Sequence, residues 1–285
     1  MGIRLDGCVF PLGDVRLTKK EIIGVIPCLI EIAVPHWELM TERWPLPSVR
    51  EWVIWFPIAL VLAAVSGYIT ALLKAKYHLP AGYSRKIFHF IVFTSAGVVG
   101  AVGGFTAVQA FGAGIGIVIL FAVLRGDKSI LFRSVSRPSD VPHERGYVLI
   151  PFLMTALGGL TSNLLFGRLA LIGYIAAGWG DALGEPVGIR WGRHTYRAPT
   201  LTGIRCVRSI EGSLAVCFGS LLGVAGALHL VFGLTGWNLF AVSAAVALST
   251  ALVEALSFHG LDNLTVQIFA TGTAALAVKI LGLFV

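Results

Sequence analysis

Long apolar runs dominate the chain, and short polar loops separate them. Each run is long enough for a helix that crosses a bilayer, which takes about 20 residues. Strands of a membrane barrel alternate in polarity at every second residue, and these runs do not. The runs cover roughly residues 52–73, 87–104, 106–124, 147–166, 168–188, 210–233, 237–257 and 263–284. The pattern therefore predicts an all-α fold, a polytopic transmembrane helical bundle of about eight spans, within a range of seven to nine.

Composition supports a membrane protein. The chain has 285 residues, of which 56% are hydrophobic and only 13% are charged. Soluble globular proteins carry about 25% charged residues, so a soluble fold is excluded. The four cysteines form no C-x-x-C pair. Neither a zinc site nor a disulfide framework is therefore indicated.

The N-terminal segment differs from the rest of the chain. Residues 22–35 are apolar, but Glu31 interrupts them and Pro35 closes them. This run is too short to span a bilayer and favours an interfacial or packed helix. The first 20 residues lack the apolar region of a signal peptide, so the first span is expected to direct insertion. We divide the chain into an N-terminal segment, 1–51, and a transmembrane domain, 52–285.

Basic residues are distributed unevenly among the loops. If the spans alternate, the loops 74–86, 125–146 and 189–209 lie on one side, together with the turn at 258–262. The short turns on the other side contain only Arg168. The positive-inside rule then places the basic loops in the cytoplasm and both termini outside. The basic residues of the cytoplasmic loops are Lys74, Lys76, Arg85, Lys86, Arg125, Lys128, Arg133, Arg137, Arg145, Arg190, Arg193, Arg197, Arg205 and Arg208.

Two carboxylates lie near the cytoplasmic end of the fifth predicted span. Asp181 and Glu185 are four residues apart and therefore share one helix face. A charge at membrane depth costs at least roughly 2.5–3.5 kcal/mol, so such residues normally have a function. The pair can hold a magnesium ion together with substrate phosphates, or one carboxylate can act as a general base. Gly180 and Gly184 are expected to allow close approach to the backbone. A buried ion pair with nearby arginines is the structural alternative.

A basic loop and a helix start follow these carboxylates. Arginine binds phosphate oxygens two at a time, although such a loop can also contact lipid headgroups. Ser209 is a favoured N-cap, and a helix N-terminus presents free N–H groups to an anion. A cap without a ligand is the alternative. The phosphate-binding candidates in this segment are Arg193, His194, Arg208, Ser209, Glu211, Gly212 and Ser213.

Two distant segments reach the same predicted face. Arg85 and Lys86 lie four and three residues before His89, so all three can face one site. Basic residues at a span end are often anchors at the membrane surface, whereas His89 is a candidate proton acceptor or phosphate ligand. Asp262 and Asn263 lie at the start of the eighth span. Asp262 is either an N-cap or part of the site.

Other features narrow the function. The chain contains no G-x-x-x-x-G-K-[ST] sequence, which excludes a P-loop kinase. The glycine-rich run at 112–116 lies within an apolar helix, so it is expected to serve helix packing rather than nucleotide binding. Glu254 lies one turn inside the membrane. The polar loop at 137–144 is expected to close over the site.

Five motifs occur in order along residues 85–263 and together resemble the polyprenol kinase family, which groups dolichol kinase, phytol kinase and CTP-dependent diacylglycerol kinase. This chain has Arg208 where the family commonly has lysine, and the first 50 residues are not covered. The motifs are R-K-x-x-H at 85–89, G-D-A-x-x-E-x-x-G at 180–188, W-G-x-H-x-Y at 191–196, R-S-I-E-G-S at 208–213 and E-x-L-S…G-L-D-N at 254–263.

The resemblance implies transfer of the γ-phosphoryl group of a nucleoside triphosphate, typically CTP, to the hydroxyl of a membrane lipid alcohol, with Mg²⁺. Asp181, Glu185 and His89 are then the catalytic candidates, and the two carboxylates are the metal ligands. Arg85, Lys86, Asp262, Asn263 and the helix-start residues named above would bind the nucleotide. No nucleic-acid partner is expected. The alternatives are a CTP-dependent phosphatidate cytidylyltransferase and a lipid or solute transporter.

Overall fold

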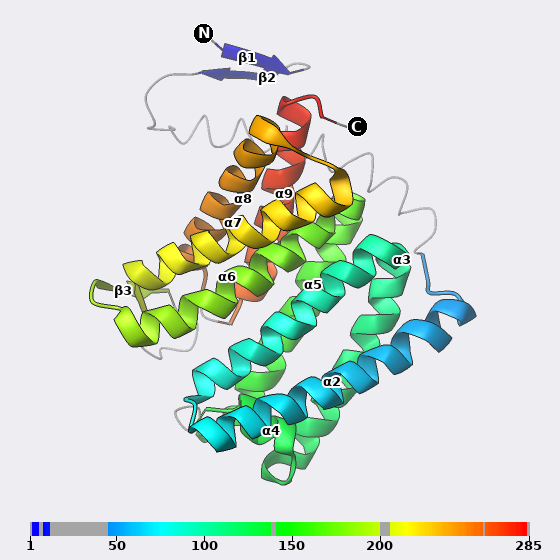
Figure 1. Ribbon diagram of the computed structural model, residues 1–285, viewed down its shortest axis with the longest axis vertical. Coiled ribbons are helices and arrows are strands. Elements are labelled where there is room, and N and C mark those ends of the chain that lie inside the picture. Colours follow the sequence, from blue (N-terminus) through cyan, green and yellow to red (C-terminus); the bar gives the residue numbers. More distant parts are fainter. Residues whose placement is uncertain are drawn as a thin grey trace.

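The computed structural model describes residues 2–5, 8–11, 45–137, 141–199, 206–258 and 260–283, and the bundle of helices in it confirms the predicted all-α fold (Figure 1). The long helices are α2 (Val49–Tyr77), α3 (Ala81–Arg125), α5 (Glu144–Phe166), α6 (Ala170–Trp191), α7 (Ile210–Phe232), α8 (Gly236–Leu256) and α9 (Asp262–Ile280). The shorter elements are η1 (Gly126–Lys128), α4 (Ile130–Val135), η3 (Gly167–Leu169) and two antiparallel hairpins, β1 (Gly2–Leu5) with β2 (Cys8–Pro11) and β3 (Thr195–Ala198) with β4 (Cys206–Ser209).

Within the described residues, six helical stretches are long and apolar enough to cross a membrane. The sequence predicts about eight spans, and the difference has a local cause. Two of the six stretches, Ala81–Lys128 and Glu144–Trp191, contain 48 residues each. Each of them has an internal break, and division at the breaks yields the eight predicted runs. The predicted polytopic bundle is therefore confirmed.

The first break lies at Gly104, where the chain reverses direction. Gly104 has φ 74° and ψ −164°, a backbone conformation that is essentially restricted to glycine. A Cβ atom built on Gly100 would lie 3.4 Å from Cγ2 of Val108. Residues eight apart in a continuous helix are separated by about 12 Å. Helix α3 therefore consists of a first arm, residues 81–103, and a second arm, residues 105–125.

The second break lies at η3, between α5 and α6. Gly167 has φ 56° and ends α5. Beyond the break, the Tyr174 hydroxyl accepts a hydrogen bond from the Asn163 side chain, which also donates to the Gly159 carbonyl at 2.9 Å. Helix α6 thus turns back along α5.

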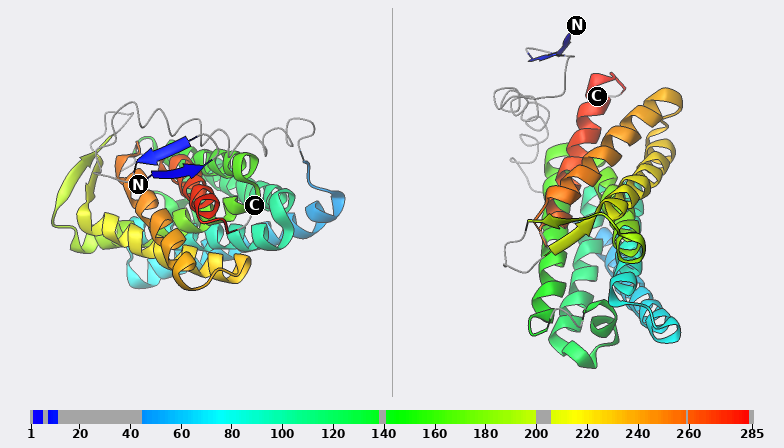
Figure 2. Two further views of the ribbon diagram at one scale, coloured as in Figure 1. Left: turned by 90° about the horizontal axis from the view of Figure 1, so that it is seen from above. Right: turned by 90° about the vertical axis from the view of Figure 1, so that its left-hand side faces the viewer.

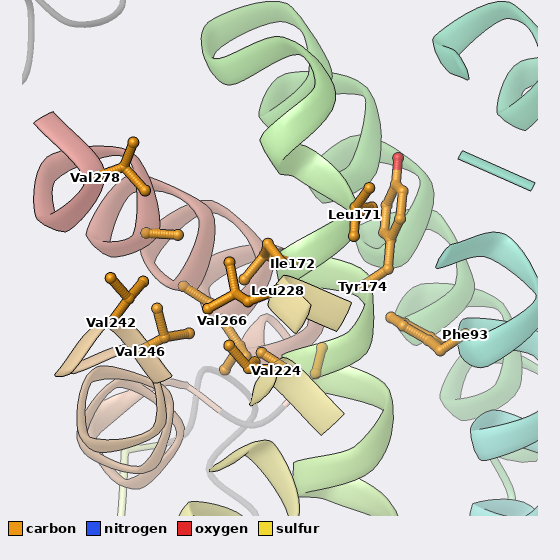
Figure 3. Close-up of a cluster of buried hydrophobic side chains, with 14 of the residues drawn as sticks. Phe93, Leu171, Ile172, Tyr174, Val224, Leu228, Val242, Val246, Val266 and Val278 are labelled. Carbon is orange, nitrogen blue, oxygen red and sulfur yellow. The ribbon is translucent and has the colours of Figure 1, made fainter. Parts of the chain in front are cut away.

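Helix α6 occupies the centre of the bundle. Its residues from Ala170 to Gly178 are buried and contribute Ile172 to a cluster of apolar side chains (Figure 3). Phe93 of α3, Val224 of α7 and Val266 of α9 belong to the same cluster. Most of the stabilisation of such a core comes from close packing, since lipid is as apolar as these side chains. The core fixes α6 between α3, α7 and α9.

The loops that carry the predicted motifs lie at one end of the bundle. In Figure 1 the end of α6 and β3 lie at the left and the short α4 lies at the bottom, whereas the α7–α8 turn lies at the upper right. The helices run roughly alongside one another, and the β3–β4 hairpin extends beyond them (Figure 2). This placement agrees with the predicted gathering of polar motifs at one face. The predicted interfacial helix at 22–35 lies outside the described residues.

Substitution of Gly104 by alanine tests the reversal in α3. An L side chain at this φ and ψ costs about 1–3 kcal/mol, so the free energy of unfolding should fall by that amount. The matched control is Gly226→Ala in the middle of α7, where an added Cβ meets no atom within 4 Å. Alanine at a mid-helix position should stabilise the protein by about 0.5–1 kcal/mol. The free energies of unfolding of the two variants are measured in detergent micelles. Equal changes for Gly104→Ala and Gly226→Ala would contradict a reversal that requires glycine.

Candidate functional site

Lys86 lies at the centre of a cluster of charged side chains between α3 and α6. Only 6% of the residue is exposed. Its ammonium group forms ion pairs with Asp181 and, at 3.2 Å, with Oε2 of Glu185. Both carboxylates therefore point toward the first arm of α3, as their four-residue spacing predicts. The predicted group of Lys86, Asp181 and Glu185 is brought together by the fold.

Glu185 also binds two arginines from different segments. Arg85 Nη2 lies 3.1 Å from Oε2 of Glu185, and Arg137 forms a further ion pair with Oε1. Gly82 permits this approach, because a Cβ atom there would lie 2.7 Å from Oε1 of Glu185. Arg137 comes from the segment before α5, so the predicted closure of this loop over the site is consistent with its position.

His89 completes what we call the ionic cluster, which comprises Arg85, Lys86, His89, Arg137, Asp181 and Glu185. The His89 ring stacks on Phe93 with a centroid distance of 4.1 Å. Its Nε2 atom lies 3.4 Å from Oδ2 of Asp181, yet it is buried and makes no hydrogen bond to any described residue. The cluster contains three permanent cations and two carboxylates. The cluster therefore has a surplus positive charge, and it contains an imidazole nitrogen that makes no hydrogen bond to a described residue.

A second group of charges surrounds Arg208. The Nε atom of Arg208 lies 3.2 Å from Oε1 of Glu254, and Nη2 lies 3.3 Å from Oδ2 of Asp262. Arg208 also donates to the backbone carbonyls of Glu254 and Ser257. This arginine thus joins the start of α7 to the α8–α9 connection. Asp262 lines the same cavity as Asp181, so the Arg208 group borders the ionic cluster.

The residues at the start of α9 have mainly structural partners. Leu261 occupies the N-cap position, so Asp262 lies in the first turn and is not the cap. The side-chain amide of Asn263 donates to the backbone carbonyl of Pro151 at 3.2 Å. The backbone carbonyl of Asn263 accepts from the side-chain amide of Gln267. Asn263 therefore connects α9 to α5.

The start of α7 is capped as predicted, and the β3–β4 hairpin is attached to it. The Ser209 hydroxyl accepts from the Gly212 amide at 3.1 Å. Glu211 contacts the His194 ring at 2.7 Å, and Ser213 shares a hydrogen bond with the Tyr196 hydroxyl. The His194 side chain is 74% exposed. Among the described residues, no ion pair links it to the ionic cluster.

Arg193 lies next to His194 on the exposed side of the same hairpin. Among the described residues, no ion pair joins Arg193 to Asp181 or Glu185. The fold therefore divides the predicted nucleotide-binding residues between the ionic cluster and the hairpin with the α7 start.

The glycines of α6 serve helix packing. A Cβ atom on Gly180 would lie 3.1 Å from Cγ1 of Val216, and one on Gly184 would lie 3.4 Å from the Gly212 carbonyl. These contacts face α7, whereas Asp181 faces α3. The expected close approach to the backbone at these glycines is therefore made by α7, which fills the space beside them.

Arg137 and Glu254 belong to these charged groups, although the sequence analysis did not include them among the site residues. The sequence places Arg137 in a polar loop and predicts that Glu254 lies one turn inside the membrane. A charged residue at membrane depth normally has a partner of opposite charge, and that signal points to Glu254. The sequence holds no comparable signal for Arg137, whose partner lies in a helix 48 residues away.

Asp181 and Glu185 are the carboxylates that fit a magnesium ion. Among the described residues, no group of three or more His, Cys, Asp or Glu side chains could hold a metal. Magnesium usually takes one or two carboxylates together with substrate phosphates and water. The pair therefore fits a metal that arrives with a polyphosphate rather than a permanently bound ion.

An apolar cavity of about 690 Å³ opens from the ionic cluster into the bundle. Lys86, His89 and Asp181 line one end of it, and Trp52 and Gln109 line the other. The walls between the two ends come mainly from both arms of α3 and from α5. An apolar cavity with a few convergent polar groups at one end is the usual form of a small-molecule site.

The chain is similar to one of known activity. It is 33% identical over 237 residues to a phytol kinase of Synechocystis sp., and the alignment covers 79% of this chain and 91% of the relative. No family model matches the chain, and no solved structure matches it at a significant level. The likeness to the phytol kinase extends over most of the bundle rather than over one motif.

Substitution of Glu185 by glutamine tests the energetic role of this carboxylate. The change leaves Arg85 and Arg137 without their negative partner in a site where all three side chains are about four-fifths buried. The free energy of unfolding should fall by about 1–3 kcal/mol. The comparison is His194→Ala, which removes an exposed pair and should change stability by less than about 0.5 kcal/mol. A smaller effect for Glu185→Gln than for His194→Ala, in denaturant titrations, would contradict this account.

Proposed function

Because the chain belongs to the phytol kinase family, we propose that it transfers the γ-phosphoryl group of CTP to the hydroxyl of phytol or a similar lipid alcohol. The observation that carries this proposal is the cavity. Its apolar walls suit a hydrocarbon tail, and its one charged end, with Lys86, His89 and Asp181, suits a hydroxyl and a polyphosphate. The excess of basic loops on this side supports a reaction at the cytoplasmic face.

The alcohol would be activated by His89. Its Nε2 atom makes no hydrogen bond to any described residue, so it would accept the hydroxyl proton as the oxygen attacks phosphorus. Asp181, 3.4 Å away, would stabilise the imidazolium that forms. The same carboxylate would orient the hydroxyl before transfer. The proton would therefore move to Nε2 of His89, and Lys86 would serve to bind phosphate rather than to accept the proton.

The phosphates would be held by the surplus positive charge of the ionic cluster. Phosphoryl transfer depends on positioning and on neutralisation of charge more than on covalent chemistry by the protein. Arg85, Lys86 and Arg137 are the cations nearest to the reacting hydroxyl. Asp181 and Glu185 would hold Mg²⁺, which when bound neutralises charge on the phosphoryl oxygens.

The rest of the nucleotide would lie toward the start of α7. Arg208 and the exposed Arg193 and His194 would supply a binding surface there, whereas the Gly212 amide already donates to the Ser209 hydroxyl. Ser209 and Glu211 would position this surface, through the cap and the contact with the hairpin. Asp262 and Asn263 would position the α8–α9 connection beside it.

Incubation of the purified protein with phytol and γ-labelled CTP tests the reaction. We expect labelled phytyl phosphate and CDP in equal amounts, and no product when Mg²⁺ is chelated. Release of pyrophosphate would instead indicate a cytidylyltransferase. Failure with every triphosphate and every lipid alcohol would contradict a kinase.

Two variants test the assigned roles. Asp181→Asn and His89→Ala should each lower kcat for the alcohol by at least about 100-fold, the usual contribution of a general base. Asp127→Asn is the matched control, because Asp127 is an exposed acid at the same end of the bundle and outside the site. It should retain the wild-type rate. An unchanged rate for His89→Ala would overturn the assignment of the proton acceptor.

A further inference from the structure

The cavity is long as well as apolar. Along the second arm of α3 its lining extends from Phe105 to Ala122, which corresponds to about 26 Å at about 1.5 Å per residue. The hydrocarbon core of a bilayer is about 30 Å thick. The cavity therefore runs through most of the membrane depth inside the bundle. Its volume of about 690 Å³ lies within the range of roughly 300–1,000 Å³ that encloses a small ligand.

Small residues in the walls create this space. Gly112 and Ala113 of the second arm and Ala156 of α5 line the cavity. A Cβ atom added to Gly112 would meet no atom within 4 Å, so empty space lies beside it. The neighbouring Gly114 differs, because its Cβ would lie 2.7 Å from Ala59. Gly112 thus opens the cavity, whereas Gly114 serves the predicted helix packing.

Polar side chains in the deeper walls already have partners. Thr155 donates to the Pro151 carbonyl at 2.8 Å, and Gln109 donates to the Pro45 carbonyl at 2.8 Å. Tyr174 pairs with Asn163. The one charged region is the end that contains Lys86 and Asp181. The chemistry of the cavity is therefore that of a hydrocarbon tail with a polar head at this end.

We propose that the cavity binds the hydrocarbon tail of the alcohol substrate inside the bundle, and that the space beside Gly112 sets which tail lengths are accepted. This inference rests on the proposed kinase function. A single tail of phytol length fits the length and volume of the cavity. The far longer tail of a dolichol exceeds both, so dolichol should be a poor substrate.

The position of Gly112 makes the inference testable. Because Gly100 contacts Val108 across the reversal, Ala122 lies level with Lys86 at the charged end, and Gly112 lies ten residues, or about 15 Å, from it along the second arm. The tail of phytol reaches past this level when its hydroxyl lies at His89. Geraniol, with a tail half as long, ends before it. A larger side chain at Gly112 should therefore exclude phytol and leave geraniol unaffected.

The experiment compares Gly112→Leu, Gly112→Val and the matched control Gly226→Leu with phytol and geraniol as acceptors. Gly226 also has empty space beside it but lies in α7, away from the cavity. Each Gly112 variant should lower kcat/KM for phytol by at least about 10-fold, the effect of crowding a hydrophobic pocket. Their activity with geraniol should stay within about twofold of wild type, which also shows that they fold.

Different results separate the two proposals. If the wild type phosphorylates neither alcohol with any triphosphate, the proposed function fails. If the wild type is active and the Gly112 variants have the same phytol-to-geraniol ratio as Gly226→Leu, the tail site is overturned. Efficient phosphorylation of dolichol by the wild type would likewise overturn the length limit.

Discussion

The ion pairs of Lys86 with Asp181 and Glu185 are the interaction on which the rest of the site depends. A lysine that is 6% exposed within a membrane bundle is tolerated only with partners of opposite charge. Here one cation holds two carboxylates from successive turns of α6 against the start of α3. His89 then lies beside Asp181, and Arg85 and Arg137 lie beside Glu185.

The second constraint is the reversal at Gly104. It turns one long apolar helix into two antiparallel arms, and both arms line the cavity. The ionic cluster at the start of the first arm is thereby placed at one end of an apolar space that the second arm and α5 enclose. The cavity thereby offers two separate environments, a charged end and an apolar body.

The sequence predicts much of this arrangement and leaves some of it open. Hydropathy predicts the spans, because bilayer thickness fixes their length. The spacing of Asp181 and Glu185 predicts a shared face, and helix geometry guarantees it. Spacing along the sequence does not predict partners on different elements, since Arg137 contacts Glu185 only through the tertiary fold. Gly112 and Gly114 look alike in the sequence, yet one borders empty space and the other packs against Ala59.

The central claim is that the alcohol binds within the bundle, with its hydroxyl at the charged end and its tail in the cavity. Photolabelling with a phytol analogue that carries a diazirine at the end of its tail tests this directly. Mass spectrometry should find the label on cavity residues near Trp52, Phe105 and Gln109, and excess phytol should prevent it. Label found instead on outward-facing residues such as Leu230 or Phe240, and unaffected by phytol, would contradict the account.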